Sequence, residues 1–303
     1  MSLVPGRVSV RVPATSANLG PGFDSLGLAL DLHDTLHAEV IASGLEIDVT
    51  GAGADSVPRD ESHLVVRAMR SAFEVLGESP TGLRLTCENV IPHARGLGSS
   101  SAAIVGGLAL ARALVADGPR RLSDDELFEL AAGIEGHPDN VAPAVYGGFT
   151  IAGHDTAPDQ AGFYSVNSPV DEGVSAVVFI PPTGVETKVA RGLLPAEIPH
   201  ADAAANSGRA ALLVAALGFA PEQLHRATQD YLHQNYRRSA MPDSLALVDA
   251  LRVDGIAAVV SGAGPTVLAF ATDNADELLT RTPTGWVSHH LQVDTTGVRT
   301  SRT

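Results

Sequence analysis

The stretch Gly96-Leu97-Gly98-Ser99-Ser100-Ser101 precedes an Ala-rich apolar run that continues to Val115. Two glycines followed by a long apolar run predict a loop that opens a helix. Such a loop lets backbone N–H groups approach an anion closely, and the helix N-terminus adds unpaired donors and a partial positive charge. Serine hydroxyls add further donors and can reach a metal. The stretch therefore predicts a phosphate-binding loop, although an ordinary Gly-Ser loop with a good N-cap has the same pattern.

This loop differs from two familiar nucleotide-binding motifs. The pattern G-x-x-x-x-G-K-[ST] is absent, and Lys188 is the only lysine in the chain. The pattern G-x-G-x-x-G is absent as well, because Ser101 stands where the third glycine would be. A phosphate group would then have to be attracted locally, by loop amides, the helix N-terminus, a metal and a few arginines.

The charge balance limits the partners of the chain. Its 35 acidic and 20 basic residues give a formal net charge of −15. Nucleic acids and anionic membrane surfaces are recognised by basic patches, so we expect neither as a partner. The sequence has no run of about 18 apolar residues, and residues 1–7 lack the apolar core of a signal peptide. We therefore expect a cytoplasmic protein that does not span a membrane.

Outside the loop, hydrophobic periodicity predicts a chain of mixed helices and strands. Alternation of apolar and polar residues predicts strands at 8–12, 26–32, 36–41, 45–49 and 83–88, with a loop at 13–24. Helical spacing predicts a helix at 64–76, and a capping box at Ser123 starts another that runs to about residue 132. Later segments predict strands at 174–180, 256–260 and 266–271, and helices at 186–194, 203–217 and 221–234. A polar segment at 153–173 separates the two halves, so we expect two domains, 1–165 and 166–303.

A second group of polar residues follows the capped helix, with Glu129 and then Glu135-Gly136-His137-Pro138-Asp139-Asn140. Acid, imidazole and amide groups crowded in one loop can bind Mg²⁺ and orient a hydroxyl. Each member also has an ordinary interpretation. Glu129 has the context of an exposed helix acid, Glu135 is interpreted as a solvated turn charge, and His137 fits a structural polar contact equally well.

Two further loops combine polar side chains with glycine. Residues 13–24 read P-A-T-S-A-N-L-G-P-G-F-D, and such a loop between strands can surround a small polar substrate. The side chains of Asn18 and Asp24 could equally form hydrogen bonds with backbone groups of a turn. Ser261-Gly262-Ala263-Gly264-Pro265-Thr266 lies between two apolar strands, where its glycines permit a close backbone approach or a tight turn.

In this order and spacing, the four segments resemble the motifs of the GHMP kinase superfamily. Residues 96–101 are similar to its phosphate-loop motif, G-L-G-S-S-A, and residues 261–265 to its C-terminal Gly-rich motif. Within the superfamily, residues 12–24 and 137–149 are similar to the opening and central signatures of the homoserine kinase family. The resemblance extends from about residue 8 to residue 271, most of the chain.

The resemblance implies an α+β, two-domain GHMP kinase fold, with a βαβ-type N-terminal ATP-binding domain and a ferredoxin-like C-terminal domain. It implies ATP and Mg²⁺ at the cleft between them. The metal ligands would be a loop serine, Ser100 or Ser99, and an acid eleven residues before the motif asparagine, which is Glu129. The nucleotide would be lined by Pro92, His93, Ala94, Arg95, Gly96, Leu97, Gly98, Ser99, Ser100, Ser101 and Ala102.

The substrate implied by the resemblance is L-homoserine, converted to O-phospho-L-homoserine on the route to threonine. The amino acid would be held by Asn18 and Asp24, with Asp24 paired to its ammonium. Its carboxylate would be held by Arg191 and Arg237, since an arginine fork matches a carboxylate. Asn140 would place the hydroxyl group.

Three further residues have implied roles. Thr187 begins a segment, Thr187 to Arg191, that looks like the T-K-x-A-R segment of the family, and His137 would also contact substrate. Asp139 stands at the position of the catalytic base in mevalonate kinase relatives, so Asn140, Asp139 and Glu129 form the implied catalytic set. The transferred phosphate itself is the alternative proton acceptor.

The chain departs from the family pattern at two places. Ser101 replaces the usual alanine, which leaves open which serine binds the metal, and His63 stands where relatives often carry an asparagine near the adenine. A kinase for another small alcohol is one alternative, but a substrate without an amine gives Asp24 nothing to pair with. A catalytically silent ligand sensor is another, and the intact acids of the central signature argue against it. The family also implies a homodimer.

Overall fold

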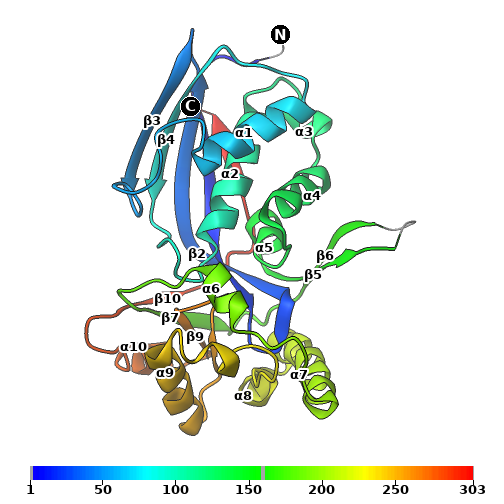
Figure 1. Cartoon of the computed structure of the whole chain (residues 1–303), viewed down its shortest axis with the longest axis vertical. Helices are drawn as coiled ribbons and strands as arrows, with labels where there is room; N and C mark the ends of the chain where they lie inside the picture. The colour runs from blue at the N-terminus through cyan, green and yellow to red at the C-terminus, as the bar shows by residue number, and fades with distance from the viewer. Residues whose placement is uncertain (1–2, 158–160, 303) are drawn as a thin grey trace.

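Two β-sheets organise the chain, one in each half of the molecule in Figure 1. The structure is a computed structural model that describes residues 3–157 and 161–302. The expected combination of helices and strands is confirmed, and the two sheets have different topologies.

The first sheet has the strand order β11-β1-β2-β4-β3; β5 also pairs with β2, and β6 pairs with β5. The long strand β2 is shared: its residues 26–28 pair with β5, and its residues 35–40 pair with β4. The strands are β1 (Val8–Asn18), β2 (Gly22–Val40), β3 (Gly44–Gly51), β4 (Gly82–Asn89), β5 (Phe149–Asp155), β6 (Gly162–Ser168) and β11 (Arg299–Arg302).

A group of helices packs beside this sheet (Figure 1). They are α1 (Leu64–Val75), α2 (Ser99–Ala113), α3 (Gly118–Arg121), α4 (Asp124–Glu135) and α5 (Val141–Tyr146). The parallel strands β3 and β4 are joined through α1, so the expected βαβ unit is present. Helix α2 is buried along nearly its whole length because its residues are small or apolar. A Cβ atom on Gly107 would lie 2.5 Å from the Val65 carbonyl oxygen, so glycine is what lets α1 approach α2 closely.

The second sheet has the order β10-β7-β9-β8, and all neighbouring pairs are antiparallel. Its strands are β7 (Ser175–Ile180), β8 (Ala258–Val260), β9 (Val267–Ala271) and β10 (Val287–Leu291). Its helical segments are α6 (Thr187–Gly192), α7 (His200–Phe219), η1 (Pro221–Gln223), α8 (Leu224–Ala227), η2 (Asn235–Arg237), α9 (Pro242–Val253) and α10 (Ala275–Leu279). Counted along the chain, this is a βαββαβ arrangement with strand order 4-1-3-2, which confirms the ferredoxin-like expectation.

The strands β7, β8 and β9 of the second sheet are buried on both faces, which explains their unbroken apolar sequences, whereas the edge strand β10 is largely exposed. Successive residues of β7 point to opposite faces. Val177 and Phe179 join a core with α9 and α10, whereas Ala176 and Val178 join the core that continues into the first sheet and α7. One hydrophobic core therefore extends from the N-terminal sheet to the near face of the C-terminal sheet.

Three expectations about secondary structure need correction. Residues 13–24 are not a loop, because β1 continues to Asn18 and β2 begins at Gly22, so this segment is the tip of a long hairpin. The helix expected at 221–234 ends at Ala227, and a short 3₁₀ segment follows at Asn235. The expected boundary at 165/166 falls inside β6, which pairs with β5, and we propose a boundary at 169–174 instead.

The last residues of the chain return to the first sheet. Strand β11 pairs with β1, as Figure 1 shows in red beside the blue strands. Asp294 ties this return to β2, because its carboxylate accepts hydrogen bonds from His33 Nε2 and from the N–H groups of Thr296 and Gly297. Residues 272–303 carried no readable signal in the sequence, and the return strand comes from that segment.

The capping box at the start of α4 is confirmed. The Ser123 hydroxyl accepts from the Glu126 N–H, and the Glu126 carboxylate accepts from the Ser123 N–H. We expect Ser123→Ala to lower the free energy of unfolding by about 1 kcal/mol, because one helix N–H loses its acceptor. Urea denaturation of this variant measures the loss. Ser207→Ala, at an exposed position inside α7, is the matched control, with a change of less than about 0.5 kcal/mol. Equal losses would contradict the capping role.

Candidate active site

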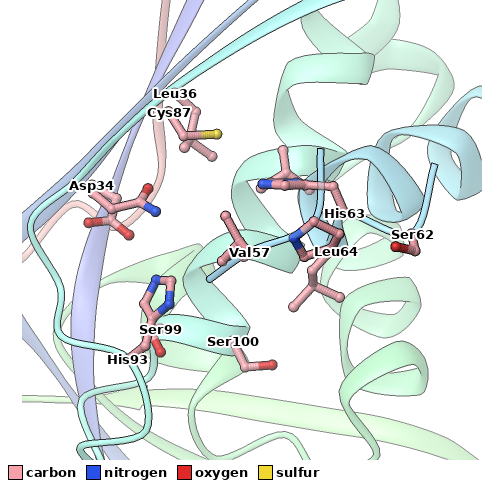
Figure 2. Close-up of a pocket in the computed structure, with 14 residues that line it drawn as sticks. Asp34, Leu36, Val57, Ser62, His63, Leu64, Cys87, His93, Ser99 and Ser100 are labelled. Carbon is pink, nitrogen blue, oxygen red and sulfur yellow. The ribbon is translucent and has the colours of Figure 1, made fainter. Parts of the chain in front are cut away.

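Two pockets meet at the start of helix α2 and share Ser99 and Ser100. The first, shown in Figure 2, has a volume of about 280 Å³ and is mostly apolar. The second has a volume of about 330 Å³ and is lined by polar and charged residues from both halves of the chain. Together they form one site with an apolar compartment and a polar one, joined at the glycine-rich loop.

The predicted loop and helix start are confirmed. Helix α2 begins at Ser99, and Gly98 precedes it with φ of 70°. Glycine is required at residue 98, since a Cβ atom there would lie 1.9 Å from the Thr15 hydroxyl oxygen. The backbone N–H groups of the first turn of α2 therefore face the region shared by the two pockets and can bind an anion.

Thr15 connects the loop to the central polar group. Its hydroxyl donates a hydrogen bond of 2.8 Å to the Asn140 side-chain oxygen. Asn140 therefore presents its NH₂ group, which can act only as a donor, for other contacts in the polar pocket that it lines. The sequence did not indicate this role for Thr15, because its partner lies 125 positions away along the chain.

The acid nearest to the loop serines is Glu135, not Glu129. The Ser100 hydroxyl donates to one carboxylate oxygen of Glu135 at 2.8 Å, and the Ser101 hydroxyl donates to the other at 3.1 Å. Glu135 lies six positions after Glu129 on the helix, which amounts to about 9 Å along the axis and a rotation of about 240°. Glu129 is exposed and lies beside Gly162 on β6. The expectation that Glu129 joins the loop is therefore corrected, because the carboxylate bound to the loop serines belongs to Glu135, the last residue of α4.

Ser100 and Glu135, which are hydrogen-bonded to each other, could also hold Mg²⁺. Two neighbouring ligands of an octahedral Mg²⁺ lie about 3.0 Å apart when each is about 2.1 Å from the ion. The two oxygens are 2.8 Å apart, and both are the hard oxygen ligands that Mg²⁺ prefers. These residues therefore fit the metal that the sequence resemblance implies.

His137 and Asp139 form a hydrogen-bonded pair in the polar pocket. His137 Nδ1 lies 2.8 Å from an Asp139 carboxylate oxygen, and the Asp139 side chain is almost fully buried. Burial acts to lower the pKa of His137, but the hydrogen bond and charge of Asp139, with the charge of Glu135, raise it above its ordinary value. The hydrogen bond to His137 fixes the orientation of the Asp139 carboxylate. The negative charge of Asp139 in turn favours the protonated imidazole.

Asp24 and Arg191 form an ion pair at the edge of the polar pocket. The guanidinium donates to both carboxylate oxygens, at 2.7 and 3.0 Å. Both side chains are more than one third exposed, so the pair is open to a ligand. The Asn18 amide is already engaged, because it donates to the Gly262 carbonyl oxygen at 2.8 Å and accepts from the Asp24 N–H at 2.9 Å. Asn18 therefore orients Asp24 as well as lining the pocket.

Arg237 also lines the polar pocket but is buried. Its guanidinium lies 5.5 Å from the centre of the Phe23 ring, and that of Arg191 lies 5.7 Å from the same centre. Phe23 therefore brings two cations together on one aromatic ring. Thr187, which begins α6, lines the same pocket one helical turn before Arg191.

The C-terminal glycine-rich motif closes the site from the other domain. The Ser261 hydroxyl lies 2.6 Å from the Gly96 carbonyl oxygen, and the Gly262 N–H donates to the Ala17 carbonyl oxygen. A Cβ atom on Gly96 would lie 2.2 Å from the Ser261 carbonyl oxygen, so the two loops touch backbone to backbone. The four sequence motifs therefore meet at one place.

Not every residue of the expected nucleotide-binding segment lines a pocket. Arg95 donates to the carbonyl oxygens of His93, Pro181 and Pro182, so it anchors the loop to the C-terminal half. Leu97 and Ala102 are fully buried in the core, and Ser101 is buried behind Glu135. The segment residues that line one or both pockets are His93, Ala94, Gly96, Gly98, Ser99 and Ser100. Pro92, Arg95, Leu97, Ser101 and Ala102 line neither of the two.

The apolar pocket holds one buried carboxylate that the sequence did not single out. In Figure 2, Asp34 lies near Leu36 and Cys87, across the pocket from His63. One oxygen of Asp34 accepts from the N–H groups of Val90 and Ile91, at 2.6 and 2.8 Å. Its other oxygen has no hydrogen-bond partner among residues 3–157 and 161–302 and is available to a ligand. Asp34 lies between the strands expected at 26–32 and 36–41, in a stretch with several other polar residues, so its sequence context did not set it apart.

Burial raises the pKa of Asp34 to about 6, although the two N–H groups and the nearby His33 act to lower it. A raised folded-state pKa means that the folded protein binds more protons between about pH 4 and pH 6. The stability contributed by protonated Asp34 is therefore present at low pH and lost as the pH rises through about 6. The difference between the unfolded-state and folded-state pKa of Asp34 corresponds to about 3 kcal/mol of folding free energy.

We expect Asp34→Asn to be more stable than the parent protein at pH 7.5 by about 1–3 kcal/mol, because the amide oxygen keeps both hydrogen bonds without a buried charge. The advantage shrinks toward pH 4.5, where Asp34 is protonated. Urea denaturation of both proteins across this range measures it. A difference that stays constant with pH would show that Asp34 does not titrate in this way.

Comparisons with known proteins identify the family of the chain. The family model for the GHMP kinases N terminal domain matches residues 63–148, and the model for the GHMP kinases C terminal matches residues 213–283. The homoserine kinase of Streptomyces coelicolor is 54% identical over 291 residues, covering 96% of this chain and 93% of that protein. The homoserine kinase of Clavibacter michiganensis is 50% identical over 298 residues, covering 96% and 93%.

Solved structures give the same relationship. The crystal structure of homoserine kinase from Cytophaga hutchinsonii has a TM-score of 0.85, 27% sequence identity and 99% coverage of both chains. Leishmania major mevalonate kinase has a TM-score of 0.69 at 15% identity, which indicates a shared fold. In the part of the chain that the structure describes, no helix has the length and apolar character to cross a membrane. The chain belongs to the GHMP kinases and, among them, to the homoserine kinase family.

Proposed function

We propose that this chain phosphorylates the hydroxyl of L-homoserine with ATP, forming O-phospho-L-homoserine and ADP for threonine biosynthesis. The observation that carries the proposal is the polar pocket beside the phosphate-binding loop. Arg191 and Arg237 line it together with the carboxylates of Glu135, Asp139 and Glu186, and Asp24 lies at its edge, paired with Arg191. These charges complement the ammonium and the carboxylate of a small amino acid.

ATP would occupy both pockets. The apolar compartment has the character of a nucleobase site, and the N–H groups at the start of α2 suit the phosphates. Mg²⁺ would be held by Ser100 and Glu135, and when bound it neutralises charge on the phosphate oxygens. Glu135 replaces Glu129 in the proposed catalytic and metal-binding set, because Glu129 is too far from the loop.

The amino acid would lie across the polar pocket. Asp24 would pair with the ammonium, while Arg191 turns from Asp24 toward the carboxylate, where Arg237 is the second partner. The Asn140 NH₂ group, fixed by Thr15, would orient the hydroxyl. Thr187 and His137 complete the lining.

The chemical step would be an in-line displacement. The hydroxyl oxygen forms a bond to the γ-phosphorus, the bond between this phosphorus and the β–γ bridging oxygen breaks, and ADP leaves. The hydroxyl proton goes to Asp139 or to an oxygen of the transferred phosphate. Positioning and charge neutralisation by the loop amides supply most of the rate enhancement.

The test is a coupled ADP-release assay with Mg·ATP and L-homoserine, L-serine, L-threonine, mevalonate, shikimate and galactose. Strong turnover with L-homoserine alone supports the proposal. Turnover with an alcohol that lacks an amine would keep the ATP site and reject the substrate. Silence on the whole panel, with ATP binding intact by calorimetry, would favour a ligand sensor.

Two further properties follow from the family and belong to the same proposal. We propose a cytoplasmic location, because ATP and the amino-acid substrate are found there, and a homodimer. Sedimentation of the purified protein tests the second property. A single species at the monomer mass of 31.2 kDa would reject the dimer.

A further inference from the structure

His233 contacts Arg237, which lines the polar pocket, and two residues at the tip of the β1–β2 hairpin, and the buried carboxylate of Asp230 lies 3.6 Å from its Nε2. The Arg237 Nη1 group donates to His233 Nδ1 at 3.0 Å. His233 Nε2 lies 2.8 Å from the carbonyl oxygen of Gly20, at the tip of the β1–β2 hairpin. The His233 ring also packs on Phe23, with ring centres 5.2 Å apart. The side chain is fully buried, so no water competes for these contacts.

These contacts allow only one protonation state of the imidazole. Arginine offers donors and no acceptor, so Nδ1 must be unprotonated to accept from Arg237. A carbonyl oxygen is only an acceptor, so Nε2 must carry the proton that it donates to Gly20. The neutral Nε2–H tautomer satisfies both partners, whereas an imidazolium would point an N–H group at the guanidinium.

Arg237 depends on this support. Its side chain is 1% exposed, and its Nε has no hydrogen-bond partner among residues 3–157 and 161–302. Besides His233, its Nη1 group has the Gly262 carbonyl oxygen at 3.3 Å. A buried guanidinium with an unpaired donor is costly unless an anion completes it. Arg237 can therefore bind an anionic ligand, and its hydrogen bond to His233 holds the guanidinium in position.

We propose that His233 is a positioning residue that, as the neutral imidazole, aims Arg237 at the carboxylate of the amino-acid substrate. The proposal rests on the proposed function of the polar pocket. His233 touches no substrate itself. It links the orientation of Arg237 to the hairpin tip that carries Asp24, so that the two ends of the amino acid are bound by one connected network.

Protonation of His233 would break the network. Burial first, and then the charge of Arg237, lower the pKa of His233, while the charges of Asp230 and Asp24 and the bond to Gly20 act to raise it. The net direction is down, so the imidazole is neutral near pH 7. As the pH falls, protonation of His233 repels Arg237 and weakens carboxylate binding. The KM for L-homoserine then rises while the KM for ATP does not.

The experiment compares two variants that each keep one ring nitrogen position. In His233→Asn, the amide oxygen can occupy the Nδ1 position and accept from Arg237. In His233→Gln, the amide nitrogen can occupy the Nε2 position and donate to Gly20, but the acceptor for Arg237 is lost. We expect His233→Gln to raise the KM for L-homoserine about 10- to 100-fold with kcat within about threefold, and His233→Asn to raise it less than fivefold.

Two readouts separate positioning from a general structural role. The first uses 2-amino-1,4-butanediol, which has no carboxylate, and the penalty of His233→Gln should disappear with it. The second is the pH profile, where the acid-side rise in KM should be present in the parent protein and absent in His233→Asn. Equal penalties in both variants, or a penalty that persists without the carboxylate, would overturn the proposal.

Turnover and the pH profile of the parent protein separate the remaining outcomes. Absence of turnover with L-homoserine would reject the proposed function itself. If both variants fail to fold, as judged by circular dichroism, the parent pH profile decides. A KM for L-homoserine that rises toward acid with an unchanged KM for ATP supports the proposal, and equal rises in both constants reject it.

Discussion

Glu135→Gln is expected to lower kcat with Mg·ATP and L-homoserine by about 100- to 1,000-fold. The carboxylate of Glu135 lies 2.8 Å from the Ser100 hydroxyl at the start of α2, so it supplies the only full negative charge in the proposed metal site. The amide keeps the shape and still accepts from the serines. It holds a divalent cation far more weakly, and the charge on the transferred phosphate is then not neutralised.

The matched control is Glu129→Gln, the same substitution one and two-thirds turns earlier on α4. Its side chain is exposed beside β6, so kcat should stay within about twofold of the parent value. Steady-state rates at increasing Mg²⁺ concentration distinguish the two. The Glu135 variant should also need more Mg²⁺ for half-maximal activity. If Glu129→Gln lost most of its kcat and Glu135→Gln kept it, Glu129 would again be assigned as the metal ligand, as the family motif implies.

Asp24→Asn is expected to raise the KM for L-homoserine by about 10- to 100-fold, with a smaller effect on kcat. The ammonium of the substrate loses its charged partner, and a hydrogen bond to a charged group is worth about 1.5–3 kcal/mol. The substitution leaves the backbone intact, since residue 24 has φ of 54° and asparagine tolerates this left-handed conformation. The loss therefore reports on binding and not on the hairpin.

The control for Asp24→Asn is Asp249→Asn, which removes the carboxylate of another arginine pair. Asp249 accepts from Arg238 at 2.9 Å on the surface, far from either pocket lining, so we expect no change in KM. A second readout is 2,4-dihydroxybutanoate, which lacks the ammonium. The parent protein should discriminate strongly against it, and Asp24→Asn should not. Unchanged discrimination would reject the pairing of Asp24 with the ammonium.

Features encoded by neighbouring residues were predictable from the sequence. The loop and helix start at Gly98 and Ser99, the capping box at Ser123 and the apolar strand at 175–180 all depend on contacts within a few positions of the chain. The family signatures are also local, and they indicated the fold and the motifs that meet at the site. The alternation of apolar and polar residues predicted two strands, at 26–32 and 36–41, where the structure has one long strand, β2.

The choice of partners was decided by tertiary structure. The family resemblance implied Glu129, but in the fold the last residue of α4, Glu135, is the acid that reaches the serines. The pairing of Asp24 with Arg191 joins residues 167 positions apart, and the hold of His233 on the hairpin tip joins residues 213 apart. Sequence determined which residue types and local elements the chain contains. Only the packing of distant elements decided which charges face each other, because hydrogen bonds and ion pairs act over a few ångströms in space regardless of separation along the chain.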